Sequence, residues 1–357
     1  MKSVSVFCLT VLSLCRLAAS QADTIQDHQV AQSRPIQLGT SGGNLNDISS
    51  LYCCSGTLGA LVKDRKGRLY ILSNNHVLGR TNRGRKREPI TQPGLVDADC
   101  FLTLSDTIAA LTKRKGIRFN GRSPNVVDAA VAQILPGQVD TNGSILGIGT
   151  LNSQIVTPTP GLAVKKSGRT SGVTQGVIAA VDVSILVDYD TVCGIGSRTA
   201  LFVHQIRITP GGFGDFSSGG DSGSLVVEDV DSCPRAVGLL FAGGDTNTFA
   251  NPIANILSQL KVSMVGCSST SSIVAVARRV SAESFAACQA AKETAEANWL
   301  KTPGIVGVGI GVSDSASGQA TLEIYCKAKT AELSATLARM PQSVPVKVIQ
   351  TGTIHAL

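Results

Sequence analysis

Three short motifs carry side chains that together could perform nucleophilic catalysis. Ser222 lies in the run Gly-Gly-Asp-Ser-Gly-Ser at 219–224, His76 ends the polar turn Ser-Asn-Asn-His at 73–76, and Asp128 opens an alternating apolar run. A serine hydroxyl is a poor nucleophile at neutral pH, so it needs an imidazole to take its proton and a carboxylate to orient that imidazole. The glycines around Ser222 permit a tight turn whose backbone N–H groups could stabilise an oxyanion. The motifs therefore predict acyl transfer by Ser222, His76 and Asp128.

Other histidines and aspartates compete for these roles. His204 sits on a β-patterned run ahead of the nucleophile motif and is the rival base, whereas His28 and His355 fall in terminal segments where we expect them to be exposed. Asp128 leads an apolar strand, in which a carboxylate can be buried beside an imidazole. The competing acids lie in a turn-rich segment; they are Asp97, Asp99 and Asp106.

The three motifs, in the order His76, Asp128, Ser222, resemble those of the chymotrypsin-like (trypsin-fold) secreted serine proteases. The similarity covers roughly residues 35–262. The run at 54–62 resembles the first hairpin of that family, and the run at 166–176 is similar to a segment of its bacterial secreted members. The run at 238–244 resembles the strand that borders the primary specificity pocket. The chain is most similar to a subgroup that carries a small C-terminal domain and resembles the plant narrow-leaf type trypsin-like protease.

The resemblance implies roles for further residues. The backbone N–H groups of Gly220 and Ser222 would form the oxyanion hole. The base of the specificity pocket, six residues before the nucleophile, would be Phe216, so we expect an uncharged, small or apolar residue on the acyl side of the cut. Substrate would also contact the bordering strand; its residues are Phe241, Ala242 and Gly243.

Two residues next to these leave alternatives open. A shift of the loop by one residue would place the Asp215 carboxylate at the pocket base in place of Phe216, and this would attract Lys or Arg. In many relatives the residue that corresponds to Asp221 pairs with an N-terminus freed by cleavage. This chain shows no start of that kind, so the partner of Asp221 and the need for activating cleavage stay open.

The pattern of apolar runs predicts a mainly β fold with a small α+β unit behind it. Between residues 35 and 262, short apolar runs are separated by Gly, Asn, Asp and Pro clusters, and the resemblance implies two six-stranded antiparallel β-barrels closed by a helix near 254–261. We expect a linker over 263–281. The last unit, 282–357, predicts a helix over 282–300, strands over 304–312 and 320–325, a helix over 330–340 and a last strand over 344–349. We expect this unit to be separable.

The first 34 residues predict a signal peptide followed by a leader segment. Residues 1–22 combine Lys2, a short apolar run and small residues around Ala18, which predicts a signal peptide. The apolar run is shorter than the ~20 residues that a bilayer needs, so we expect no stable membrane insertion. Residues 23–34 are polar and predict a leader. The sequence thus indicates a secreted protein, either extracellular or periplasmic.

Eight cysteines follow residue 22, and in an exported chain an even count indicates disulfides. We expect Cys100 to pair with Cys53 or Cys54, and Cys193 to pair with Cys233. No Cys-x-x-Cys and no His-Glu-x-x-His occurs, so we expect no metal. The glycines at 307–311 do not open a helix inside a βαβ unit, so they do not indicate a dinucleotide site, and we expect no cofactor.

The formal net charge is +7. Basic residues gather at 80–87 and at 113–122, with Phe119 as the one aromatic residue among them. This low aromatic content argues against a nucleic-acid surface. We interpret both clusters as solvated loops, with attraction of acidic substrates or an anionic cell surface as the alternative. The oligomeric state stays open.

The predicted function is therefore that of a secreted serine endopeptidase that cleaves polypeptides through an acyl-enzyme. Two alternatives use the same residues: a secreted binding or scaffold protein that keeps the fold with little activity, and an esterase. Labelling by a fluorophosphonate separates active from inactive forms, and turnover of peptides against esters separates protease from esterase.

Overall fold

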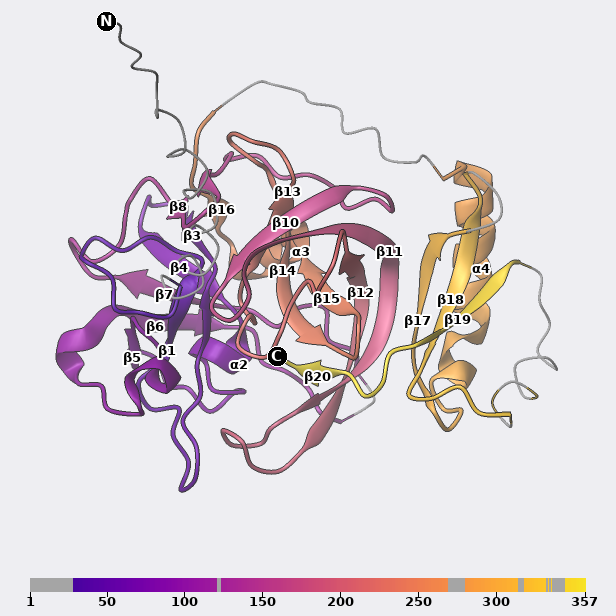
Figure 1. Ribbon diagram of the computed structural model, residues 1–357, viewed down its shortest axis with the longest axis horizontal. Coiled ribbons are helices and arrows are strands. Elements are labelled where there is room, and N and C mark those ends of the chain that lie inside the picture. Colours follow the sequence, from indigo (N-terminus) through magenta and orange to yellow (C-terminus); the bar gives the residue numbers. More distant parts are fainter. Residues whose placement is uncertain are drawn as a thin grey trace, which may run out of the picture.

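The computed structural model of this protein describes residues 28–120, 123–268, 280–313, 318–331, 333, 335 and 344–357. The fold is mainly β, as predicted. Two curled sheets lie side by side, and a smaller unit with one long helix lies at the far side of the second sheet (Figure 1). The C-terminus returns from this unit to the space between the two curled sheets.

The first sheet closes into a barrel. β2 (Gly56–Leu58) and β3 (Ala60–Lys63) follow each other directly and are interrupted only at Gly59, whose N–H still donates to Leu72 O of β4 at 3.0 Å. Together they form one barrel strand. The ring then runs through β4 (Leu69–Ser73), β7 (Ala130–Ile134), β6 (Thr107–Arg114), β5 (Pro89–Thr91) and β1 (Thr40–Asn44), which pairs back to β2.

Apolar side chains from both faces of these strands are buried in one cluster, which extends beyond the interior of the barrel. Leu61 and Ile71 share one face of the sheet, and Leu72 and Val131 share the other. Short elements connect its strands: α2 (Asn75–Leu78), and the 3-10 turns η1 (Leu95–Ala98) and η2 (Leu104–Asp106).

The second sheet closes in the same way. The ring runs through β10 (Ala163–Gly168), β11 (Gly172–Tyr189), β12 (Arg198–Pro210), β15 (Thr248–Pro252), β14 (Ala236–Gly243) and β13 (Leu225–Glu228), which pairs back to β10. The short hairpin β8 (Ser144–Ile145) and β9 (Gly149–Thr150) lies between the barrels in sequence. The predicted closing helix is α3 (Ile253–Leu260), and β16 (Ser263–Met264) then pairs with β3 of the first barrel.

The C-terminal unit extends the second barrel. Its elements are α4 (Ala282–Trp299), β17 (Ile305–Val312), β18 (Ala320–Cys326) and β19 (Val346–Gln350). β17 pairs with the middle of β11, for example Val181 with Ile310, so one sheet continues through both parts. α4 covers one face of the added strands (Figure 1). Most of the predicted helix over 330–340 lies outside the described residues. A strand that was not predicted, β20 (His355–Ala356), follows β19.

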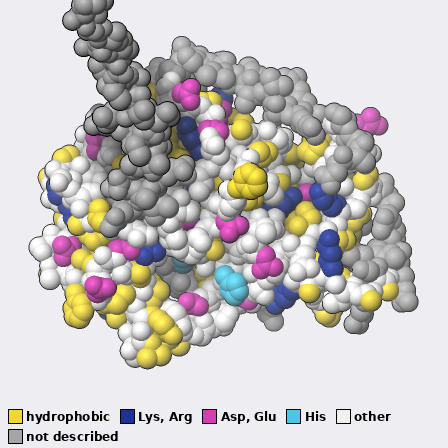
Figure 2. All heavy atoms as spheres, in the orientation of Figure 1, with side chains coloured by type: hydrophobic (Ala, Val, Ile, Leu, Met, Phe, Trp, Pro, Cys, Tyr) yellow, Lys and Arg dark blue, Asp and Glu magenta, His cyan; other side chains and the backbone are white. Residues whose placement is uncertain are grey.

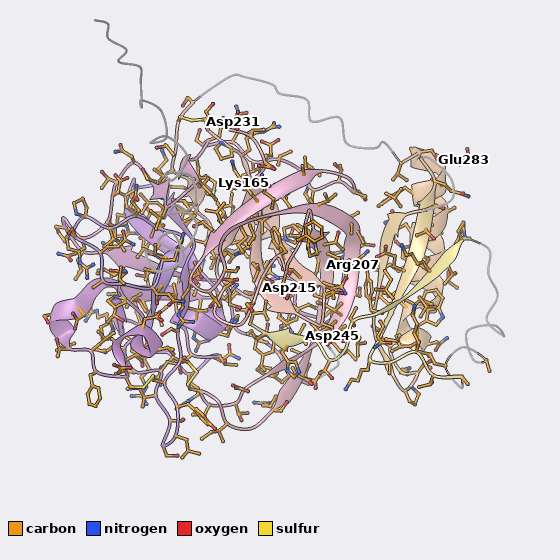
Figure 3. All side chains as sticks on the ribbon, viewed as in Figure 1. Lys165, Arg207, Asp215, Asp231, Asp245 and Glu283 are labelled. Atoms are coloured by element: carbon orange, nitrogen blue, oxygen red, sulfur yellow. A yellow bond between two sulfur atoms is a disulfide. The ribbon has the colours of Figure 1, made fainter. Side chains whose placement is uncertain are left out.

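A buried ion pair also connects the C-terminal unit to the second barrel. Arg207 of β12 donates through Nε and Nη2 to the two oxygens of Glu323 of β18, at 2.9 and 2.8 Å. Tyr325 donates its hydroxyl to the same carboxylate at 2.7 Å. Figure 3 shows Arg207 on the side of the barrel that faces the added strands. Whether residues 282–357 are separable thus depends on how β11 and Arg207 behave without them.

Three disulfides form within the described residues, and one predicted pairing is wrong. Cys53 pairs with Cys100, one of the two partners expected for that cysteine. Cys193 pairs with Cys54 and not with Cys233, because the loop after β11 lies against the first barrel. Cys233 pairs with Cys267 just after β16. The two cysteines of the C-terminal unit are buried free thiols; they are Cys288 and Cys326. The even number of cysteines had indicated that these two would be bridged.

The predicted leader is partly packed. His28 is 2% exposed, and its Nδ1 lies 2.9 Å from Gly39 O, so the expectation that it is exposed is wrong. Arg34 donates to the side chain of Gln92 at 2.9 Å. The predicted signal peptide lies outside the described residues. Over the residues that are described, no helix has the length and apolar character needed to cross a membrane.

The basic cluster at 80–87 is mostly at the surface. Arg83, Arg85, Lys86 and Arg87 are exposed, while Arg80 makes an ion pair with Glu88 at 2.7 Å. On the face drawn in Figure 2, Lys and Arg side chains are scattered among uncharged ones and form no continuous patch. This distribution fits the interpretation of solvated loops.

Candidate active site

His76 and Asp128 meet at one end of the first barrel, although they are 52 residues apart in sequence. His76 lies in α2, directly after β4. Asp128 lies just before β7, the strand that pairs with β4. Because β4 and β7 are antiparallel neighbours, the residue that follows one strand lies beside the residue that precedes the other.

The Asp128 carboxylate is buried, with 0% exposure, and both of its oxygens have hydrogen-bond partners. Its Oδ1 accepts from the backbone N–H of Asn75 at 2.7 Å and of His76 at 3.2 Å. Its Oδ2 lies 2.5 Å from His76 Nδ1 and accepts from the hydroxyl of Tyr189 at 2.9 Å. The carboxylate therefore fixes the ring so that Nδ1 bears a proton and Nε2 faces the cleft.

Tyr189, the last residue of β11, holds this carboxylate from the second barrel. Its ring packs edge-on against His76, with centroids 5.7 Å apart, and stacks on Phe202 at 6.0 Å. Burial and the neighbouring Asp128 charge raise the pKa of Tyr189 well above its ordinary value. The hydroxyl thus keeps its proton and donates it to Asp128 over the pH range in which proteins are usually studied.

Opposing effects act on His76. Burial is the largest single effect and disfavours the charged ring, but the Asp128 carboxylate, the Leu357 oxygen and Asp47 together outweigh it, and the net effect raises the pKa of His76. Asp47 faces the same cleft and contributes in the same direction. Asp47 is itself 7% exposed, and burial raises its pKa to about 7, against the opposing pull of Arg80 and Arg83.

Ser222 lies in the loop before β13, pressed against the first barrel. Thr57 of β2 donates its N–H to Ser222 O at 2.8 Å and its hydroxyl to Gly220 O at 3.0 Å. A side chain at Gly223 would clash with Thr57 O at 2.3 Å, and its φ of +93° favours glycine. This close approach explains why glycine follows the serine.

The same loop leaves two backbone donors available. Asp221 N donates to Ser218 O at 3.0 Å and Gly223 N donates to Leu240 O at 2.9 Å. Within the described parts of the chain, the N–H groups of Gly220 and Ser222 donate to no protein acceptor. Alternate N–H groups of one tight turn can therefore face a common point, which is the arrangement an oxyanion hole requires.

Asp221 has a partner inside the second barrel. The sequence had not identified this partner. Lys166 of β10 is 0% exposed, and its Nζ lies 3.4 Å from Asp221 Oδ2. The carboxylate also accepts from the N–H groups of Thr170 at 2.8 Å and Ser218 at 2.9 Å. Burial lowers the pKa of Lys166, opposed by the Asp221 charge. The counter-charge that the resemblance assigns to a freed N-terminus is thus supplied by a lysine of the second barrel.

The residues predicted to bind substrate belong to the loop before Ser222 and to β14. Phe216 is 1% exposed and belongs to an apolar cluster with Ile178, Val226 and Val237. Asp215, the alternative, is exposed in the preceding loop (Figure 3). In β14, the side chains of Phe241 and Ala242 are buried, so they can offer only backbone groups, whereas Gly243 has no side chain to block the cleft. Phe241 O accepts from Ser222 Oγ at 3.2 Å.

The cleft is occupied by β20. This strand pairs antiparallel with β14, with Ala356 opposite Ala242 and His355 opposite Gly243. Leu357 N donates to Phe241 O at 3.3 Å, and the backbone oxygen of Leu357 lies 3.3 Å from His76 Nε2. An open cavity of about 170 Å³ remains next to His76, lined by residues that include Asp47, Arg80 and Tyr189.

The competing residues have other partners. His204 is exposed, and its Nδ1 lies 2.6 Å from Asp182 Oδ1. Asp97 makes a two-point contact with Arg169, at 2.5 and 2.6 Å. Asp106 caps the turn at Thr103, and Asp99 is an exposed residue with φ +50°.

Three features of the site were not predicted: Tyr189, Lys166 and β20. Lys166 lies in the run that resembles bacterial proteases, and a lysine on a strand of mostly buried residues was a signal that could have been noticed. Nothing in the sequence around Tyr189 marks it as a partner of Asp128, because the two residues meet only when the barrels pack together. A strand of two residues carries no periodicity at all.

Comparisons with known proteins found solved structures similar to this chain but no matching family model or curated protein. Among solved structures, it is similar to a glutamic acid specific serine protease described as using a histidine triad in substrate binding, with 18% identity, a TM-score of 0.43, and 64% of this chain and 100% of that chain covered. It is also similar to Thermobifida fusca protease A, with 19% identity, a TM-score of 0.42, and coverage of 65% and 99%. At these scores the likeness is loose, and the assignment of the fold rests on the strand pairing.

Proposed function

We propose that this chain is a serine endopeptidase that cleaves peptide bonds through an acyl-enzyme, with Ser222 as nucleophile, His76 as base and Asp128 as the residue that orients the base. The observation that carries the proposal is the position of His76. Its Nδ1 is 2.5 Å from a buried carboxylate, and its Nε2 faces an oxygen of an extended peptide segment that lies beside Ser222.

The reaction would proceed in two acyl-transfer steps. Ser222 Oγ attacks the substrate carbonyl carbon while its proton passes to His76 Nε2, and the N–H groups of Gly220 and Ser222 stabilise the resulting oxyanion. His76 then gives the proton to the leaving amine, and the C–N bond breaks. A water molecule attacks the acyl-enzyme in the same manner and releases the new carboxylate.

The pocket supports cleavage after an uncharged residue. Phe216 is buried in an apolar cluster at the position assigned to the pocket base, and Asp215 points to solvent. A charged side chain would lose its hydration there without a counter-charge. Strong cleavage after Lys or Arg, lost in Asp215→Ala and kept in Phe216→Ala, would show that the loop is shifted in the working enzyme.

Export is part of the proposal. Three disulfides form in the structure, and disulfides persist in oxidising compartments such as the periplasm or the extracellular space. The internal Lys166–Asp221 pair supports a loop that is shaped without a freed N-terminus.

A fluorophosphonate labelling experiment tests the function. We expect slow, stoichiometric labelling of the purified chain on the peptide that contains Ser222, no labelling of Ser222→Ala, and normal labelling of the control Ser218→Ala, whose side chain is exposed in the same loop. If the protein reacts with the fluorophosphonate, its turnover of a peptide amide then separates an endopeptidase from an esterase. A folded protein that is never labelled would be a binding protein with the protease fold.

A further inference from the structure

The C-terminal residues 355–357 bind the cleft as an extended peptide. Their backbone pairs antiparallel with β14, Ala356 opposite Ala242 and His355 opposite Gly243, and Leu357 N donates to Phe241 O. On the other side, His355 pairs with Asp188 at the end of β11. The segment therefore adds a short strand between β11 and β14. Many proteins recognise extended peptides by adding them as a strand in this way.

The Leu357 side chain fills apolar space. It packs against the cluster that contains Phe216, Val226 and Val237. It also lies directly over Gly243, since a Cβ at that position would come within 2.9 Å of Leu357 Cδ1. An aliphatic side chain of this size is thus accommodated where a substrate side chain would be read.

The segment also covers the reacting groups. Ser222 is 0% exposed, and the single oxygen of Phe241 accepts from both Ser222 Oγ and Leu357 N, at 3.2 and 3.3 Å. His76 Nε2, the atom that must take the proton, faces the backbone oxygen of Leu357. With the segment in place, a substrate carbonyl cannot reach the nucleophile.

The segment is held by anchors that lie before it. Ile354 is 1% exposed and belongs to the core of the second barrel, and Asp188 N donates to Ile354 O at 2.9 Å. Thr351 O accepts from Asp245 N at 2.9 Å. Because the segment is tethered this close to the cleft, its binding is intramolecular and does not depend on concentration.

We propose that residues 355–357 are an intramolecular occupant of the substrate cleft, which holds the enzyme in a self-inhibited state and marks its substrates as peptides with a leucine-like residue before the cleaved bond. The proposal rests on the proposed function, because only an active site can be inhibited. Activity then requires that the segment leave the cleft while Ile354 stays packed, a shift between two populations.

Two variants release the segment in different ways. A chain ending at Ile354 keeps the anchors and removes the occupant. Leu357→Asp keeps the chain length and places a charge in apolar space. The matched control is Leu104→Asp, the same change at a leucine that is 74% exposed. Thermal unfolding of each variant checks that the fold is retained.

The rate of fluorophosphonate labelling at Ser222 is the readout. We expect both release variants to be labelled at least about tenfold faster than the full chain, as a population shift of that size requires, and the control to match the full chain. The acetylated peptide Ile-His-Ala-Leu, which copies residues 354–357, should inhibit the shortened chain competitively, while Ile-His-Ala-Asp should not.

The outcomes separate the two proposals. Equal, rapid labelling of the full chain and both variants would overturn self-inhibition and leave the protease function intact. Folded variants that are never labelled would overturn the protease function, and self-inhibition with it. Rapid labelling of the shortened chain without inhibition by the leucine peptide would show that the cleft does not prefer leucine-like residues.

Discussion

His76 Nε2 lies 3.3 Å from the backbone oxygen of Leu357, although 281 positions separate the two residues. Nδ1 of the same ring faces the Asp128 carboxylate, so a favourable contact at Nε2 requires the doubly protonated, charged ring. The contact with Leu357 accordingly contributes to the raised pKa of His76. The occupied cleft therefore favours the form of the histidine that cannot act as a base.

Changes at Asp128 and Tyr189 should affect catalysis to different degrees. Asp128→Asn should lower kcat by about 10⁴, because the ring loses its orientation and its counter-charge. Tyr189→Phe removes one donor to Asp128 Oδ2 but keeps the ring packing, so we expect a loss of about tenfold or less, in line with one lost hydrogen bond.

The pH profile distinguishes a positioning role for Tyr189 from a structural one. Without the hydroxyl, the Asp128 charge acts more strongly on His76, so the acid limb of kcat/KM should move to higher pH. The control is Tyr70→Phe, which also removes a hydroxyl that donates to an aspartate, at 3.1 Å, but away from the cleft. Identical pH profiles for the two variants would reject the positioning role.

Asp47 should make the fold less stable as the pH rises. Its pKa is about 7 in the folded chain, against 3.8 as the ordinary value. Between these values the folded chain keeps a proton that the unfolded chain has lost, so the free energy of unfolding falls by roughly up to 1.4 kcal/mol per pH unit. Asp47→Asn should remove this slope.

Thermal unfolding from pH 4 to pH 8 measures the effect. We expect Asp47→Asn to match the parent near pH 4 and to exceed its Tm at pH 8. Asp215→Asn, at an exposed aspartate, is the control and should keep the slope of the parent. A slope that survives in Asp47→Asn would mean that the carboxylate is better solvated than its burial indicates.

Lys166→Met should disrupt both stability and catalysis. It leaves the Asp221 carboxylate buried without a cation, which costs about 3–5 kcal/mol when one partner of a buried pair is removed. The loop that carries Ser222 should then relax, and labelling should fall with kcat. Lys165→Met is the control: the neighbouring residue on the same strand lies on the other face, where its Nζ donates to Val230 O at 2.7 Å. Equal urea-unfolding midpoints would contradict the role of Lys166.

Gly243→Val should change specificity. A side chain there would meet Leu357, and by the same geometry a leucine of a substrate. We expect kcat/KM for a leucine peptide to fall at least about 10–200-fold relative to an alanine peptide, the range for a mismatch of a single methylene in an apolar pocket. Gly212→Val, in open space, should keep the parent's ratio. An unchanged ratio in Gly243→Val would show that substrates follow another path.

Glu323→Gln should weaken the connection between the second barrel and the C-terminal unit. The change leaves Arg207 buried without a counter-charge, at a cost of about 3–5 kcal/mol. Glu293→Gln, on the exposed face of α4, is the control for urea unfolding. A chain truncated after Lys261 tests whether the protease part folds alone. It lacks β16, Cys267, β17 and Glu323, so it should be less stable than the full chain even where it folds and hydrolyses small substrates.

The local pattern of the chain predicted most of the elements. Alternating apolar runs with Gly and Pro between them indicated the strands of both barrels, and the spacing at 253–261 and 282–300 indicated α3 and α4. These patterns are readable because the period of side chains along a strand or helix is fixed by the backbone. The triad residues came from motifs whose chemistry needs those residue types, and their roles stay predictions until the variants are measured.

Contacts between distant residues were decided only by the tertiary structure. The partner of Cys193, the burial of His28 and the pairing of Lys166 with Asp221 depend on which loops meet when the barrels close. β20 is the clearest case, because His-Ala-Leu has no pattern of its own and becomes a strand only between β11 and β14. The sequence alone determined which chemistry the chain can carry. The folded chain decided that residues 355–357 lie in the cleft, since short segments take their conformation from the surfaces that bind them.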